Sequence, residues 1–274
     1  MVRIIVDSSA DLRPDLRSQV GIVPLTVRFG NEEYVDGVEL TPAAFYKKLA
    51  VCKELPTTSQ AAPYAFSELF EEAVEAGDTV VAIVVSSALS GTYQSAVIAA
   101  ADYPGKVFVV DSRSIAIGSA ILAEYALDLV DRGWDAQAIA AELDEAKEKL
   151  HLFAVVDTLE YLQRGGRLSK AVAIAGGLLS VKPVIALEDG IIKMAGKARG
   201  NKQANAFMDS KVWELGIDWD KPCMLGYTGT DDELLAKYRA QSEIWTGDVQ
   251  NMLVCGVVGT HVGPGAVAVA FFAK

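Results

Sequence analysis

Short, unbroken apolar runs alternate with amphipathic segments through the first half of the chain. The runs cover residues 2–6, 79–85 and 107–110, and polar residues follow each of them. A strand without polar alternation is typical of a parallel sheet, in which both faces are buried. Helical spacing of apolar residues fills the intervals, at 63–76, 92–101 and 115–132. This order predicts an open α/β fold with a mainly parallel sheet.

Two local signals add detail to this first half. Residues 22–29 and 34–35 are predicted to form a hairpin around Gly30-Asn31, which is a pair of turn-forming residues. Thr41 followed by Pro42 is a typical helix start, because threonine caps free N–H groups and proline fits the first turn.

The pattern changes close to residue 148. A charged helix over 135–149 is followed by six strand candidates, at 152–156, 184–187, 191–194, 224–227, 252–258 and 266–272. Helices are expected at 202–213 and 232–241, and Glu188-Asp189-Gly190 signals a tight turn. This half is predicted to be α+β with a mixed or antiparallel sheet. We therefore expect an N-terminal α/β domain, 1–148, and a C-terminal α+β domain, 149–274.

Length and composition are those of a folded chain with a large core. The 274 residues suggest one large domain or two ordinary ones, and 51% of them are apolar. The apolar stretch 266–273 is far shorter than the roughly 20 residues that a membrane span needs. Residues 1–4 enter a strand directly and show no signal-peptide pattern. We expect a monomeric protein of the cytoplasm.

Charge and motif content exclude several classes of protein. The net charge of −11 would be repelled by phosphate backbones, so we expect no nucleic-acid partner. The 3 cysteines and 2 histidines show neither a CxxC pattern nor metal-ligand spacing, so no metal is expected. Phosphate loops, dinucleotide-binding glycine motifs and the G-x-S-x-G elbow are missing. We therefore expect no catalytic residue and no cofactor.

Polar residues gather where a ligand site is expected. Ligands of open α/β sheets bind outside the carboxyl ends of the strands, where this chain has Asp7-Ser8-Ser9, 86–91 and 111–113. Ser90 and Gly91 also precede a helix, whose free N–H groups attract anions. By itself, Ser90 is more readily explained as the N-cap of that helix.

Three further segments combine polar side chains with turns or glycine. Residues 56–60 contain three hydroxyl groups and one amide before an expected helix, which alone would be an ordinary capping loop. His261 lies among glycines between two expected strands, where a tight turn would bring it close to a ligand. A structural histidine explains it equally well. Arg164-Gly165-Gly166-Arg167 suits phosphate or carboxylate recognition, or is a basic helix end with a glycine cap.

In their order along the chain, these segments resemble the DegV family of bacterial fatty-acid-binding proteins. The resemblance rests on six motifs that span almost the whole chain: VDSSAD at 6–11, TSQ at 58–60, LSGTYQSA at 89–96, VDS at 110–112, RGGR at 164–167 and GTHVGPG at 259–265. Each motif is weak alone, whereas all of them at family-like spacing are specific. The family often has Pro and Ser after TSQ, and this chain has Ala61 and Ala62 there, which removes no proposed ligand.

The resemblance implies a two-domain protein that encloses a long-chain fatty acid, such as palmitate, between its domains. It implies that Thr58 and Ser90, together with Gly91, hold the carboxylate and that His261 lies beside it. The supporting positions are then Ser59, Gln60, Asp7 and Ser8. In some members a separate fatty acid kinase converts the bound acid into acyl-phosphate for phospholipid synthesis. Such a partner would dock on the side that carries Arg164 and Arg167.

Two other functions compete with this one. The fold class is also similar to the substrate-binding subunit of dihydroxyacetone kinases, in which a histidine holds a small carbonyl compound. His261 is the candidate for that role. A serine hydrolase could be assembled from Ser90, His261 and Asp7, although no elbow motif supports it.

Overall fold

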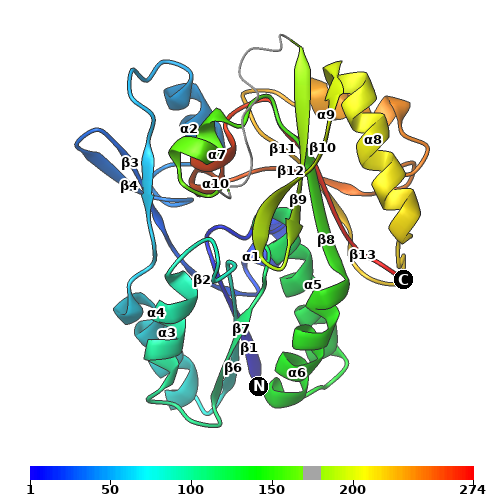
Figure 1. The fold of residues 1–274 in the computed structure, drawn as a ribbon. Helices are drawn as coiled ribbons and strands as arrows, with labels where there is room; N and C mark the ends of the chain where they lie inside the picture. Colours follow the sequence, from blue (N-terminus) through cyan, green and yellow to red (C-terminus); the bar gives the residue numbers. More distant parts are fainter. Residues whose placement is uncertain (169–179) are drawn as a thin grey trace.

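The computed structural model describes residues 1–168 and 180–274. Its N-terminal half is built on a parallel sheet in the order β2-β1-β6-β7 (Figure 1). The strands are β1 (Val2–Asp7), β2 (Gly21–Val23), β6 (Thr79–Val84) and β7 (Val107–Asp111). Side chains alternate between two faces, so that Ile4 and Val81 join one core while Ile5 and Val80 join the other. The open parallel sheet expected from the apolar runs is thus confirmed.

Helices cover both faces of this sheet. On one face lie α3 (Pro63–Glu75) and α4 (Thr92–Ala100), and on the other lie α5 (Ile117–Asp131) and α6 (Ala136–Ala146), as Figure 1 shows. The short helices α1 (Pro14–Arg17) and α2 (Pro42–Leu49) lie in the connections, and the 3₁₀ turn η1 (Lys147–Lys149) follows α6. The hydroxyl of Thr41 accepts a hydrogen bond from the N–H of Ala44, which confirms the predicted helix start.

A small antiparallel sheet, in the order β4-β3-β5, differs from the single hairpin expected at 22–35. The predicted strand 22–29 is divided at Pro24, which has no N–H to donate to a sheet ladder. Its first part, β2, joins the parallel sheet, and its second part, β3 (Thr26–Phe29), pairs with β4 (Glu32–Val35) around Gly30. The expected capping loop at 57–60 is instead β5 (Thr57–Ser59), which pairs with β3.

The C-terminal half contains a six-stranded mixed sheet in the order β10-β9-β8-β13-β11-β12. Its strands are β8 (Leu150–Val155), β9 (Val181–Glu188), β10 (Ile191–Arg199), β11 (Met224–Tyr227), β12 (Gln250–Leu253) and β13 (Val267–Phe272). Helices α8 (Gly200–Leu215) and α9 (Glu233–Gln241) cover one face, where Phe153 and Val155 are buried. The other face, which carries Leu152 and Ala154, packs against α5 of the N-terminal half.

The turn between β9 and β10 has the expected form. Asp189 and Gly190 both have positive φ, 52° and 74°, as a two-residue hairpin turn requires. Its tip contacts the N-terminal half, because the hydroxyl of Ser86 donates to the carbonyl of Gly190 at 2.8 Å.

The strand predicted at 252–258 is correct only at its first two residues, and the glycine turn around His261 is wrong. Strand β12 ends at Leu253, and Gly256–Val262 form helix α10, which packs against α7 (Glu160–Arg164), α2, β3 and β5. An apolar run without alternation does not separate a buried strand from a buried helix. The glycines serve close packing, because a Cβ at Gly259 would lie 2.6 Å from the hydroxyl oxygen of Tyr46.

Helix α10 joins the two halves of the molecule. It comes from the C-terminal half of the sequence, yet its residues Val257 and Val258 lie in the core around Phe45 of the N-terminal half. The described strands of the six-stranded sheet all follow Lys149, where η1 ends. We keep the division into 1–148 and 149–274 as a proposal on this basis.

Replacing Gly259 by alanine is expected to destabilise the protein by about 1–3 kcal/mol, because the core is overpacked. The added methyl group would overlap the hydroxyl of Tyr46 and the ring of Phe45, which are rigid and buried. Urea unfolding measures the effect. Gly247→Ala is the matched control, because a Cβ there would have no neighbour within 4 Å. Equal stability of the two variants would contradict the packing role of Gly259.

Candidate ligand-binding site

Three neighbouring pockets lie where β5, α7 and α10 meet the ends of the parallel strands. We call the middle one, of about 350 Å³, the inner chamber. The outer pocket, of about 620 Å³, shares Thr58, Arg167 and His261 with the inner chamber. The apolar cavity, of about 40 Å³, shares Ile115, Ile192, Val258 and Val262 with it. Polar side chains therefore stand at one side of the chamber and apolar ones at the other.

Thr58 and His261 are brought together from positions that are 203 residues apart. The hydroxyl oxygen of Thr58 lies 2.8 Å from Nε2 of His261. Pairing of β5 with β3 places Thr58 opposite Val27, and α10 brings His261 to it. The juxtaposition that the motifs suggested is therefore present in the structure.

His261 is neutral at physiological pH. Burial, followed by the nearby charge of Arg167, lowers the pKa of His261 to about 4. Its Nδ1 is buried and makes no hydrogen bond to any described residue. A Cβ at Gly165 would lie 2.2 Å from that atom, so a glycine of the RGGR motif makes room for the ring. A neutral imidazole has one donor and one acceptor nitrogen, which suits a hydrogen-bond relay with Thr58.

The two arginines of the RGGR motif occupy different places. Arg164 is 64% exposed and pairs with Glu160 at 2.6 Å, at the outer pocket. Arg167 lines both the outer pocket and the inner chamber. Its guanidinium donates to the carbonyl oxygens of Leu89, at 3.2 Å, and Gly165, at 2.6 Å. Arg167 therefore brings a positive charge to the chamber itself, which the sequence analysis had assigned to the partner side.

Ser90 and Gly91 line the inner chamber at the start of α4. The hydroxyl of Ser90 lies 2.9 Å from that of Thr92 and accepts a weak hydrogen bond from the N–H of Thr92 at 3.3 Å. A Cβ at Gly91 would lie 2.0 Å from Oε1 of Gln60, so glycine allows this approach. Gln60 in turn donates to the hydroxyl of Ser95 at 3.1 Å. Ser59 also lines the chamber, and the expected head-binding residues thus surround one space.

Asp7 and Ser8 do not line the inner chamber, although the next residue, Ser9, does. The buried carboxylate of Asp7 accepts hydrogen bonds from the hydroxyl of Ser9, at 2.5 Å, and from the N–H of Val85, at 2.6 Å. Ser8 accepts from the N–H of Leu25 at 3.1 Å. The chamber residue of this motif is Ser9, which the sequence analysis missed.

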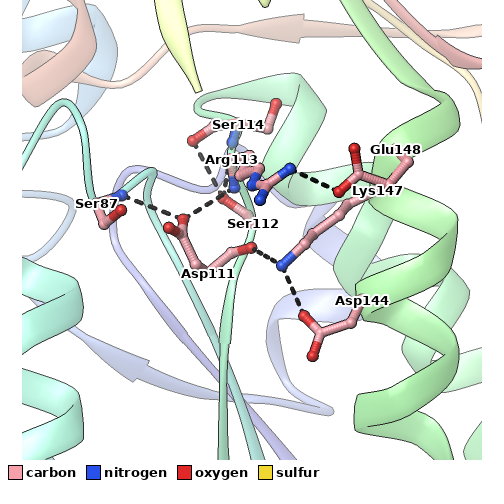
Figure 2. A network of polar contacts seen from close by, with 8 residues as sticks. All are labelled: Ser87, Asp111, Ser112, Arg113, Ser114, Asp144, Lys147 and Glu148. Atoms are coloured by element: carbon pink, nitrogen blue, oxygen red, sulfur yellow. Dashed lines mark hydrogen bonds and ion pairs between the residues drawn. The ribbon is translucent and has the colours of Figure 1, made fainter. Parts of the chain in front are cut away.

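The third strand end, at 111–113, forms a structural network (Figure 2). The carboxylate of Asp111 accepts from the N–H groups of Ser87, at 3.1 Å, and Arg113, at 3.0 Å. Lys147 donates to the carbonyl of Asp111 at 3.0 Å, and Arg113 pairs with Glu148 at 2.6 Å. These contacts fix the strand end to the end of α6, and none of these residues lines the inner chamber.

The apolar cavity lies between the two halves of the molecule. Its walls come from the residues before α5, from α10, and from the face of the six-stranded sheet that is turned toward the N-terminal half. The lining residues are Ile115, Ala116, Leu152, Ala154, Ile185, Leu187, Ile192, Gly226, Val254, Val258, Val262, Ala266 and Ala268, with Ala186, Tyr227 and Thr228. The sequence did not predict these lining residues, because they come from several strands, a helix and connections that are brought together only by the tertiary fold. An apolar molecule that entered here would be shielded from water.

A hydrolase relay is not formed. His261 contacts Thr58, Ser90 contacts Thr92, and Asp7 contacts Ser9 and Val85. Relays of this kind need the nucleophile, base and acid to be hydrogen-bonded in series. Within residues 1–168 and 180–274, no group of three or more His, Cys, Asp or Glu residues could hold a metal ion. In the same residues no helix is both long enough and apolar enough to cross a membrane.

Two buried carboxylates hold the start of α10. Oδ1 of Asp11 accepts from the N–H of Cys255 at 2.8 Å, and Oδ2 of Asp36 accepts from the hydroxyl of Ser8 at 3.0 Å. Oδ1 of Asp36 faces the N–H groups of Gly256 and Val257 without a close hydrogen bond. Burial raises the pKa of Asp36 to about 6, and it raises the pKa of Asp11 well above its usual range.

Fold and site together define an α/β protein in which a polar chamber adjoins an apolar cavity. The chain belongs to the DegV family, which it matches over residues 1–274 and whose description is that of an uncharacterised protein family. The similarity expected from the six motifs is confirmed.

Individual relatives cover the whole chain. A DegV domain-containing protein of Caldanaerobacter subterraneus subsp. tengcongensis is 38% identical over 281 aligned residues, which include 100% of this chain and 99% of the relative. A solved DegV family protein from Thermus thermophilus, described by its fatty acid binding, has a TM-score of 0.88 at 32% identity and covers 100% of this chain and 99% of its own. A stearic-acid-binding protein from Eubacterium ventriosum has a TM-score of 0.83 at 27% identity, with 100% and 99% covered.

The buried carboxylate of Asp36 predicts a pH dependence of stability. Its pKa is about 6 in the folded protein against an ordinary 3.8, so the folded state binds the proton more tightly. This contribution is complete below about pH 4 and is lost as the pH rises through 6. Asp36→Asn is therefore expected to reduce the loss of unfolding free energy between pH 5 and pH 7 by about 1 kcal/mol.

Urea unfolding at several pH values measures this slope. Asp11 and Asp7 also make unfolding free energy fall as the pH rises, because burial raises the pKa of each. Both are present in wild type and in Asp36→Asn, so they do not affect the difference between the two slopes. Asp15→Asn serves as the control, because Asp15 is 65% exposed. A slope that is the same in wild type and Asp36→Asn would refute this assignment.

Proposed function

We propose that this protein binds one long-chain fatty acid, with the carboxylate in the inner chamber and the tail in the apolar cavity. The observation that carries the proposal is the shared wall of these two spaces, formed by Ile115, Ile192, Val258 and Val262. A ligand that crosses this wall must be polar at one end and apolar over the rest of its length. The solved relatives named for fatty acid or stearic acid binding support the same ligand class.

The tail supplies most of the binding free energy. Each buried methylene contributes about 0.8 kcal/mol, so about 14 of them contribute on the order of 10 kcal/mol before the costs of association. The apolar cavity, at about 40 Å³, is small for such a tail. Its side chains must therefore separate as the chain enters, and this cost is part of what the tail offsets.

The head of the ligand finds several hydrogen-bond donors. Hydroxyl groups come from Thr58 and Ser90, and the guanidinium of Arg167 supplies a positive charge. Since His261 is neutral, it orients the hydroxyl of Thr58 rather than adding a second charge. Hydroxyl groups hold a carboxylate without enclosing both of its oxygens, which leaves it able to react.

The outer pocket suggests what happens to the bound acid. It reaches the head group through Thr58, His261 and Arg167, and its rim carries Arg164. We propose that a separate fatty acid kinase docks here and transfers a phosphoryl group to the carboxylate, which yields acyl-phosphate for phospholipid synthesis. In this scheme the protein is a non-catalytic, monomeric subunit that acts in the cytoplasm.

The first test is to extract the purified protein and identify bound lipid by mass spectrometry. We expect a long-chain fatty acid in near-stoichiometric amount. Thr58→Val should weaken palmitate binding about 10- to 100-fold, because a hydrogen bond to a charged group is worth about 1.5–3 kcal/mol. Calorimetry or displacement of a fluorescent fatty acid measures the affinity.

Thr57→Val is the control for this variant, because Thr57 is exposed on the same strand and does not line the inner chamber. An empty extract without uptake of added palmitate would favour a small carbonyl ligand at His261. Unchanged affinity after Thr58→Ala and Ser90→Ala together would reject the proposed head site.

The kinase proposal is tested at Arg164, which does not line the inner chamber. Arg164→Ala should leave fatty acid affinity unchanged and lower partner-dependent phosphorylation about fivefold or more, equivalent to about 1 kcal/mol. Lys237→Ala is a matched control, because Lys237 is 65% exposed and pairs with Glu233 four residues earlier, as Arg164 pairs with Glu160. Normal phosphorylation by Arg164→Ala would remove this residue from the docking surface.

A further inference from the structure

The lining residues show which end of the apolar cavity is away from the inner chamber; we call this the far end. Ile115, Ile192, Val258 and Val262 line both the cavity and the inner chamber, so they mark the near end. Val254, Gly226 and Ala268 line the cavity alone. These residues therefore lie on the side away from the head-binding groups.

Helix α10 and the residues before it give this axis a direction. Val254, Val258 and Val262 follow one another at intervals of four residues and all line the cavity. His261 is beside the last of them, at the chamber. At 1.5 Å per helical residue, the distance along α10 from His261 to Gly256, two residues after Val254, is on the order of 8 Å. Val254 thus marks the end that a ligand tail would reach last.

The facing wall is shaped by three residues in one cross-strand row. Ala154 of β8 is opposite Ala268 of β13, which is opposite Gly226 of β11. Residues paired across neighbouring strands point to the same face of a sheet. The next row, with Leu152, Ala270 and Met224, carries larger side chains at both ends. The apolar cavity lies over the row of small residues, with Ala154, Ala268 and Gly226 in its wall.

Gly226 packs closely against neighbouring side chains. A Cβ there would lie 3.2 Å from Cγ2 of Ile117 and 3.5 Å from Cγ2 of Val254, which lines the cavity. A larger residue at Gly226 therefore reduces the space beside Val254, and neither residue lines the inner chamber.

We infer that Ala268 and Gly226 determine the longest acyl chain that the protein accepts. The inference rests on the proposed fatty acid function. Substituting larger residues at these positions shortens the cavity from its far end. Long chains then lose the burial of their last methylenes, whereas shorter chains keep all of their contacts.

The experiment compares the affinities of saturated acids with 12, 14, 16 and 18 carbons for wild type, Ala268→Val and Gly226→Ala. We expect the ratio of 18-carbon to 12-carbon affinity to fall about tenfold in Ala268→Val, which corresponds to about two methylenes left unburied. Gly226→Ala should shift the ratio in the same direction and serves as the second variant if Ala268→Val does not fold.

Ala270→Val is the matched control. Ala270 lies on the same strand and the same face, is fully buried, and does not line the cavity. It should overpack the core without changing the chain-length ratio. An equal loss at all chain lengths in both Ala268→Val and Gly226→Ala, or the same bias in Ala270→Val, would overturn the inference. If wild type binds none of the four acids, the proposed function itself fails.

Discussion

The packing of α10 against the N-terminal half is the contact on which the binding site depends. Gly256 and Gly259 let the helix backbone approach Phe45 and Tyr46, and this close approach leaves no room for a side chain. The other surface of the same helix carries His261 to Thr58 and places Val258 and Val262 in the wall between chamber and cavity. One short helix thus joins the two halves, completes the polar chamber and covers the apolar cavity.

The net charge of −11 is unfavourable for an anion, whereas the charge beside the chamber is favourable. Charges on the exposed surface are screened by salt beyond about 10 Å, so distant surface carboxylates have less influence than a charge that lines the chamber. Arg167 is nearby, and its guanidinium is held by the carbonyl oxygens of Leu89 and Gly165. The same charge helps to keep His261 neutral. With its proton on Nε2, the neutral imidazole can donate to the hydroxyl oxygen of Thr58, which leaves the single O–H of Thr58 available for a carboxylate.

The sequence predicted those features that depend on local pattern. The parallel strands, the Thr41 cap and the Asp189-Gly190 turn followed from apolar runs and turn residues. The strand predicted at 252–258 ends early at Leu253, and the turn predicted around His261 is a helix, because Gly256 and Gly259 allow close helix packing against Phe45 and Tyr46, which are distant in sequence. Motif matching brought Thr58 and His261 together, but it could not separate Ser9, which lines the chamber, from Asp7 and Ser8, which support it. Nor could it show that Arg167 lines the inner chamber as well as the outer pocket, because the direction of a side chain is set by tertiary contacts.

Several features at the start of α10 lower the stability of the folded state. Asp11 and Asp36 are both buried beside it, and each has one carboxylate oxygen without a partner among the described residues. Buried charge of this kind costs free energy at neutral pH, and glycines add conformational entropy to the unfolded chain. The helix that completes the site is therefore held less firmly than its burial alone would suggest. A ligand whose tail lies against Val258 and Val262 adds contacts at that same helix, and a ligand that binds only the folded state raises stability. On the proposed function, the contacts of the tail with Val258 and Val262 therefore offset part of the cost of keeping α10 in place.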